Sequence, residues 1–118
     1  GLYTVVQDDW ADWSAGDVVR ITDGPGANQI NLSEVWPNPA YGDKLADLII
    51  NVDPATGAAK LATNNLIFAD YGQKTSAYIP SNGTNGYVFS CTGYIGLKIG
   101  LKYGSTDYGV NTLTLQRK

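Results

Sequence analysis

Apolar and polar residues alternate along much of this chain with the two-residue period of a β-strand. The longest example covers residues 95–103, where Ile, Leu, Ile, Leu and Tyr alternate with Gly, Lys, Gly and Lys. We expect the apolar set to face a core, and the outward glycines to mark strong curvature or a close approach of the backbone. The final segment, residues 110–118, alternates in the same way and places Leu113 and Leu115 inward.

Residues 47–63 predict the clearest hairpin in the sequence. Its turn, DPATG at residues 53–57, has an Asp that accepts backbone N–H groups, a Pro that presets φ and a Gly that can adopt positive φ. Five apolar residues fall on one face of the hairpin: Leu48, Ile50, Val52, Ala59 and Leu61.

Other short β-prone segments are separated by Gly, Pro and Asn turns, and no long period of 3.6 residues occurs. Further predicted segments are residues 2–6, 17–24, 28–36, 64–72, 75–80 and 87–104. We therefore expect a single all-β domain over residues 1–118, an antiparallel meander of about eight strands. Closure into a small, lipocalin-like β-barrel would remove exposed strand edges, and a β-sandwich is the alternative.

The segment DDWADWSAGD, residues 8–17, combines four aspartates with two tryptophans. An Asp N-cap and a glycine in the C′ position predict a short N-terminal helical turn. Trp10 and Trp13 would then share one face and anchor the turn in the core, plugging one end of the barrel. Exposed tryptophans at a binding surface are the alternative. A calcium loop of the EF-hand type is excluded, because Trp10 and Val19 fall at ligand positions.

The composition fits a folded domain and gives little sign of nucleic-acid binding. Hydrophobic residues make up 43% of the chain, charged residues 16%, and the net charge is -3. The basic residues are scattered, and no apolar run is long enough to span a membrane as a helix. Because the chain opens at Gly1, we expect it to be a processed part of a longer precursor.

Most familiar catalytic sites are missing from the sequence. Without histidine, neither a Ser-His-Asp nor a Cys-His site can form, and zinc lacks its nitrogen ligands. Cys91 is the only cysteine, and we expect it to be a small buried hydrophobic residue. A pair of carboxylates acting on glycosidic bonds stays open, with Glu34 and ten aspartates available. We expect a non-enzymatic protein without metal or cofactor.

Aromatic residues are the most suggestive chemical feature, with eight tyrosines and three tryptophans, many of them beside glycines and turns. Flat rings stack on the apolar faces of sugars, while amides and carboxylates bind sugar hydroxyls. Half-buried positions at strands and sheet rims explain most of the tyrosines equally well. The candidate ligand-binding residues are Trp10, Trp13, Trp36, Tyr41 and Tyr108.

Three patterns in the second half of the chain carry a family resemblance: IxVDxxTG at residues 50–57, CxGxIxL at 91–97, and Leu113 and Leu115 before Lys118. Together they resemble the small β-barrel domains of secreted and surface lipoproteins from gut anaerobes. The resemblance implies an exported protein of the cell envelope, either lipid-anchored or surface-associated, that assists in polysaccharide capture. It implies no catalytic motif.

We therefore expect a non-catalytic binding module of an exported bacterial lipoprotein, with a glycan as the first ligand to test. A structural or protein-interaction domain of a larger envelope lipoprotein is one alternative. A small barrel that carries an apolar ligand in its mouth is another. The expected partners are a polysaccharide or another envelope protein, with membrane contact only through a lipid anchor outside this chain.

Overall fold

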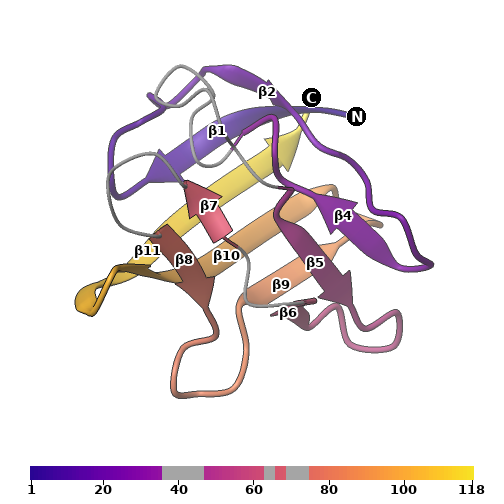
Figure 1. The fold of residues 1–118 in the computed structure, drawn as a ribbon. Helices are drawn as coiled ribbons and strands as arrows, with labels where there is room; N and C mark the ends of the chain where they lie inside the picture. The colour runs from indigo at the N-terminus through magenta and orange to yellow at the C-terminus, as the bar shows by residue number, and fades with distance from the viewer. Residues whose placement is uncertain (36–46, 63–65, 69–74) are drawn as a thin grey trace.

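The computed structural model describes residues 1–35, 47–62, 66–68 and 75–118, and these form strands and turns without a helix (Figure 1). The expected all-β class is therefore confirmed. The eleven strands of the described residues are β1 (Leu2–Asp8), β2 (Val18–Arg20), β3 (Thr22–Asp23), β4 (Gln29–Asn31), β5 (Ile49–Val52), β6 (Ala59–Leu61), β7 (Leu66–Phe68), β8 (Thr75–Tyr78), β9 (Gly86–Phe89), β10 (Tyr94–Tyr103) and β11 (Thr106–Arg117).

A seven-stranded antiparallel sheet is built around the long β10–β11 hairpin. Its strand order is β2-β1-β11-β10-β8-β7, and β9 also pairs with β10. The first half of β10 pairs with β9 and the second half with β8, while β11 pairs along nearly all of its length. On the other side of β11 lies β1, so the first and last strands of the chain are neighbours.

A second, four-stranded sheet has the sequential order β3-β4-β5-β6. The predicted hairpin at residues 47–63 provides β5 and β6. Its turn has the expected chemistry, because the Asp53 carboxylate accepts the N–H of Ala55 at 2.8 Å and Gly57 has a φ of 77°. The turn prediction is therefore confirmed.

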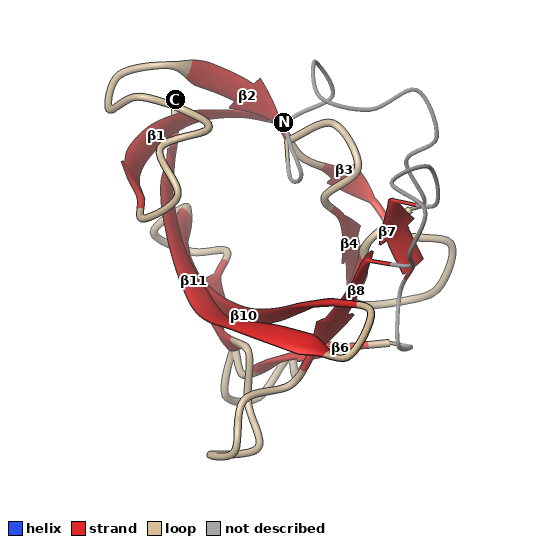
Figure 2. Cartoon of the chain, turned by 60° about the vertical axis from the view of Figure 1, so that its left-hand side comes forward, coloured by secondary structure: helices blue, strands red, loops and turns tan. Residues whose placement is uncertain are grey.

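The predicted closed barrel is wrong, because the strands form two separate sheets around a shared interior (Figure 2). On one side of β10, the pairing partners are β9 for its first half and β8 for its second half. An isolated bridge between Ala58 and Tyr87 joins the sheets on this side. Having two antiparallel sheets is a feature shared with the β-sandwich alternative.

The core lies between the two sheets and contains the inward residues that the alternation predicted. Ile95, Leu97 and Ile99 are at most 1% exposed, and Leu113 and Leu115 are fully buried. The hairpin of the four-stranded sheet adds further buried side chains from the opposite side: Leu48, Ile50, Ala59 and Leu61. The period-two pattern therefore predicted the inner faces of both sheets.

The predicted helical turn at residues 8–17 is wrong. The Asp8 carboxylate does accept backbone N–H groups, from Trp10 and Trp13 at 3.1 Å each, as an N-cap would. Ala11, however, has a φ of 56°, which is outside the right-handed helical region. Asp8 therefore closes consecutive turns instead of starting a helix.

Candidate ligand-binding surface

Three aromatic rings form a row on the outer face of the seven-stranded sheet, which we call the aromatic strip. Tyr87 and Phe89 belong to β9 and Tyr94 begins β10, and their exposed fractions are 45%, 42% and 37%. The ring centroids of Tyr87 and Phe89 are 5.6 Å apart, with planes inclined by 14°. Those of Phe89 and Tyr94 are 6.0 Å apart, with planes inclined by 23°.

The rings of the aromatic strip overlap only in part. Carbon atoms in contact lie about 3.5–4.0 Å apart, so nearly parallel rings with larger centroid separations are offset sideways. An offset leaves part of each ring face uncovered, in keeping with the exposure of all three side chains. Uncovered ring faces can stack on a second apolar surface.

Strand geometry fixes the strip. Val88 packs against the core, so its neighbours Tyr87 and Phe89 point to the opposite face of β9. Phe89 is the register partner of Tyr94, which carries the row across to β10. The strip therefore rests on paired strands, and its rings are held by a rigid element.

Gly96 provides the space in which the Tyr94 ring lies. A Cβ atom at Gly96 would fall 2.7 Å from Tyr94 Cζ and 2.8 Å from its Cε1, which is closer than real side chains approach. The Tyr78 ring covers Gly100 in the same way. The close approach expected at the outward glycines of β10 is therefore made by tyrosine rings.

Polar groups flank the strip on β11. Gln116 is the register partner of Tyr94, and Thr114 is the partner of Gly96. The Gln116 amide donates to the carbonyl of Thr92 at 2.7 Å, which holds it beside the rings. The exposed rings can stack on the apolar face of a sugar, and the neighbouring amide and hydroxyl groups can bind its hydroxyl groups.

Among the candidate residues from the sequence, Trp13 acts as an anchor. It packs against the core, and its Nε1 donates to the carbonyl of Val35 at 2.6 Å. Trp10 is also partly buried against the core. The interpretation that both tryptophans anchor their segment is therefore confirmed, although the helix expected to carry them is absent.

Trp10 and Tyr108 are brought together by the fold, at the opposite end of β10 from the strip. With Leu101 they line a pocket of about 360 Å³. Tyr108 is 56% exposed and lies beside Tyr103, with ring centroids 6.5 Å apart. Ligand binding at Trp10, Trp13 and Tyr108 stays a prediction.

Two candidate residues, Trp36 and Tyr41, lie outside the described residues. The three strip residues are not among the candidates predicted from the sequence. The signal available for two of them was the order Tyr87-Val88-Phe89, in which an inward valine separates two outward rings.

The aspartates near the N-terminus serve local structure. Asp8 binds backbone N–H groups, and the hydrogen bond from Gln7 lowers the pKa of Asp9. Burial, together with the nearby charge of Asp8, raises the pKa of Asp12. Within the described part of the chain, no group of three or more His, Cys, Asp or Glu side chains is placed to hold a metal ion.

Cys91 and Glu34 occupy exposed positions. Cys91 lies in the turn between β9 and β10, so the expectation that it is buried is wrong. A turn that projects from the sheet has no core to bury its side chains. Glu34 is exposed in the turn that follows β4.

The described part of the chain contains no helix that is long and apolar enough to cross a membrane. No family model matches the chain, and no curated protein or solved structure does so either.

Proposed function

We propose that this chain is a non-catalytic glycan-binding domain and that the aromatic strip is its contact surface. The observation that carries the proposal is the row of three offset, exposed rings at Tyr87, Phe89 and Tyr94. Large exposed aromatic side chains grouped on one surface mark interaction sites in soluble proteins.

The chemistry of the strip favours a neutral polysaccharide. Pyranose rings present a face of C–H groups, which packs against the uncovered faces of aromatic rings. Their hydroxyl groups can bind the amide of Gln116 and the hydroxyl of Thr114. A row of rings on a sheet face offers several stacking positions in succession, as a chain of sugars requires.

The proposal includes a location at the bacterial cell envelope. Its support is the resemblance of the hairpin turn, the Cys91 segment and the last strand to exported lipoproteins of gut anaerobes. In that setting the domain would hold a polysaccharide for other envelope proteins, while a lipid anchor outside this chain would supply membrane attachment.

Affinity electrophoresis through gels that contain mixed-linkage β-glucan, xylan or galactomannan tests the proposal. We expect at least one polymer to retard the wild-type domain. Tyr94→Ala and Phe89→Ala should each weaken binding by about two- to tenfold, the range of one aromatic stacking contact. The matched control is Tyr108→Ala, which removes a tyrosine outside the strip that is more exposed, at 56%, than Phe89 or Tyr94.

Two results would contradict the proposal. One is the absence of retardation by any neutral plant or microbial polysaccharide. The other is unchanged retardation of a Phe89→Ala/Tyr94→Ala double variant that retains the wild-type thermal midpoint. Loss of binding in Tyr108→Ala alone would move the site to the pocket beside Trp10.

A second candidate function is a protein-interaction module. Leu2, Val6 and Val18 are 45%, 52% and 43% exposed on β1 and β2. Exposed aliphatic side chains on adjoining strands offer an apolar surface to another envelope protein. A photo-crosslinking amino acid at position 6 should then give protein adducts in living cells, and a purely glycan-binding domain should give none.

A further inference from the structure

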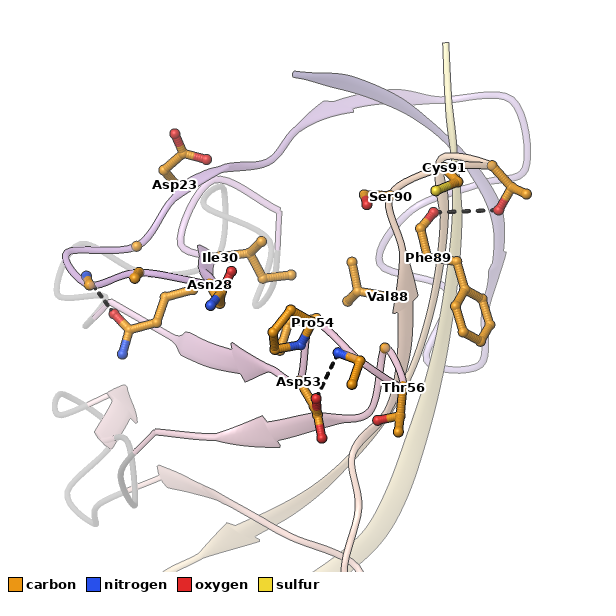
Figure 3. A pocket seen from close by; sticks show the side chains of 18 residues that line it. Asp23, Asn28, Ile30, Asp53, Pro54, Thr56, Val88, Phe89, Ser90 and Cys91 are labelled. Carbon is orange, nitrogen blue, oxygen red and sulfur yellow. Dashed lines mark hydrogen bonds between the residues drawn. The ribbon is translucent and has the colours of Figure 1, made fainter.

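A cleft of about 930 Å³ lies between three hairpin turns at one end of the molecule (Figure 3). The turns join β3 to β4, β5 to β6, and β9 to β10, so both sheets contribute to it. We call it the three-turn cleft. Its volume falls within the range of about 300–1,000 Å³ that is typical of small-molecule sites.

Hydrogen bonds fix the three turns relative to one another. The N–H of Val52 donates to the carbonyl of Asn28 at 2.8 Å, which ties the first turn to β5. The N–H of Val88 donates to the carbonyl of Gly57 at 2.8 Å, which ties the second turn to β9. The cleft is therefore preformed, and a ligand would have little loop ordering to oppose its binding.

The centre of the cleft is apolar. Its lining includes three aliphatic residues that pack against the core and are only partly buried: Ile30, Val52 and Val88. Figure 3 shows Ile30, Pro54 and Val88 directed toward one another across the opening. Partly exposed aliphatic side chains at the base of a preformed cleft favour a ligand with an apolar body.

The charges around the cleft disfavour an anionic ligand. Asp23 and Asp53 both line it, on either side of the apolar centre (Figure 3). Its described lining contains no lysine or arginine. The Arg117 guanidinium donates to the carbonyl of Ser90 at 3.0 Å, but Arg117 does not line the cleft. A carboxylate or phosphate would therefore enter against two negative charges.

From this geometry we propose that the three-turn cleft is a second binding site, which takes a small uncharged molecule with an apolar body. The cleft adjoins the aromatic strip, because Phe89 lines the cleft and also belongs to the strip, whereas Tyr87 and Tyr94 do not line it. Val88 and the Phe89 ring lie on opposite sides of β9 (Figure 3). The proposal does not depend on glycan binding. Failure of the glycan proposal would leave this one standing.

A matched pair of ligands, 1-octanol and octanoate, tests the proposal, because the two share an apolar chain and differ in charge. In a methyl NMR titration at pH 7, octanol should shift the methyl signals of Ile30, Val52 and Val88 along a saturable curve. Octanoate should bind at least about tenfold more weakly, because of repulsion by the two aspartates.

Blocking variants at exposed turn residues avoid damage to the core. Ala27→Trp and Ala55→Trp place a large ring in the cleft from residues that are exposed and line it. Each should weaken octanol binding by about tenfold or more, whereas Ala15→Trp, in an exposed turn outside the lining, should leave it unchanged. Non-saturable octanol shifts, equal affinity for octanoate, or unchanged octanol binding in both blocking variants would overturn the proposal.

Discussion

Tyr78 on β8 is linked to β11 by a hydrogen bond of its side chain. Its Oη donates to Asp107 Oδ1 at 2.6 Å, while its ring covers Gly100. The same ring lies 5.3 Å from Lys102 Nζ. The hydrogen bond raises the pKa of Tyr78 and lowers the pKa of Asp107, because it favours a protonated phenol and an ionised carboxylate.

Tyr78→Phe should raise the pKa of Asp107 toward its ordinary value of 3.8, because the variant keeps the ring but removes the donor. A carbon NMR titration of the carboxyl group measures this change. In the wild type, the contribution of Asp107 to stability is present well above pH 3.8 and is lost as the pH falls through the lowered pKa. We therefore expect the variant to have a smaller loss of stability on acidification.

The backbone N–H of Gly109 still donates to Asp107 in Tyr78→Phe, so the pKa should stay somewhat below 3.8. Tyr78 has the opposite dependence. Its contribution is present below pH 10.0 and is lost as the pH rises through the raised pKa. An unchanged pKa at Asp107 in the variant would refute the role given to the hydroxyl.

Among the strands, β10 has the most pairing partners. It pairs with β11 on one side and with β8 and β9 on the other. Its inward residues fill the core, while glycines on its outward face receive the rings of Tyr78 and Tyr94. One strand therefore positions both the core and the aromatic strip.

Gly96→Ala should destabilise the domain by about 1–3 kcal/mol, since the new methyl group forces the Tyr94 ring off the strand. Urea unfolding measures this cost. Adding Tyr94→Ala should remove most of it, so the double variant should be more stable than the two single effects predict together. Strictly additive free energies would show that the ring does not lie on Gly96.

The sequence predicted strands and inward faces well, because each depends on neighbours within one strand. The alternation of residues 95–103 and the DPATG turn are of this kind. The helix predicted after Asp8 was wrong, because the same side-chain hydrogen bonds that cap a helix also close turns. The positive φ of Ala11 shows that the segment forms turns. The aromatic strip depends on the pairing of Phe89 with Tyr94, which alternation along one strand does not show.

Across the whole molecule, two buried asparagines have opposite roles. Asn85 links the sheets, since its side chain accepts the N–H of Leu61 at 2.9 Å and donates to the carbonyl of Lys98 at 3.0 Å. Asn111 is 1% exposed, and its side-chain Nδ2 and Oδ1 have no hydrogen-bond partner within the described structure. A buried amide without partners costs stability.

Asn111→Leu should stabilise the domain by about 1–3 kcal/mol, because an apolar side chain of similar size replaces an unsatisfied amide. Asn85→Leu is the matched comparison. It leaves Leu61 and Lys98 with unpaired backbone groups and should destabilise by about 1–3 kcal/mol for each. Differential scanning calorimetry measures both, and a lower melting temperature for Asn111→Leu would show that its amide is satisfied in solution.

Whether the strands close into one barrel could not be predicted from the sequence. Whether the two sheets join depends on contacts between segments far apart in the chain, such as the bridge between Ala58 and Tyr87. A hairpin pattern predicts only the pairing of neighbouring strands and leaves such long-range contacts open.

The pairing of β1 with β11 places both chain ends at one site, where the N–H of Lys118 donates to the carbonyl of Leu2 at 3.0 Å (Figure 1). A short peptide linker could therefore join the ends, with new ends opened at the turn around Gly104, and circular permutants of this kind should fold. Adjacent ends also make the domain easy to graft into a surface loop of a host protein. Several grafted copies would each present a row of rings, and their combined avidity would convert weak single contacts into firm retention on a polymer.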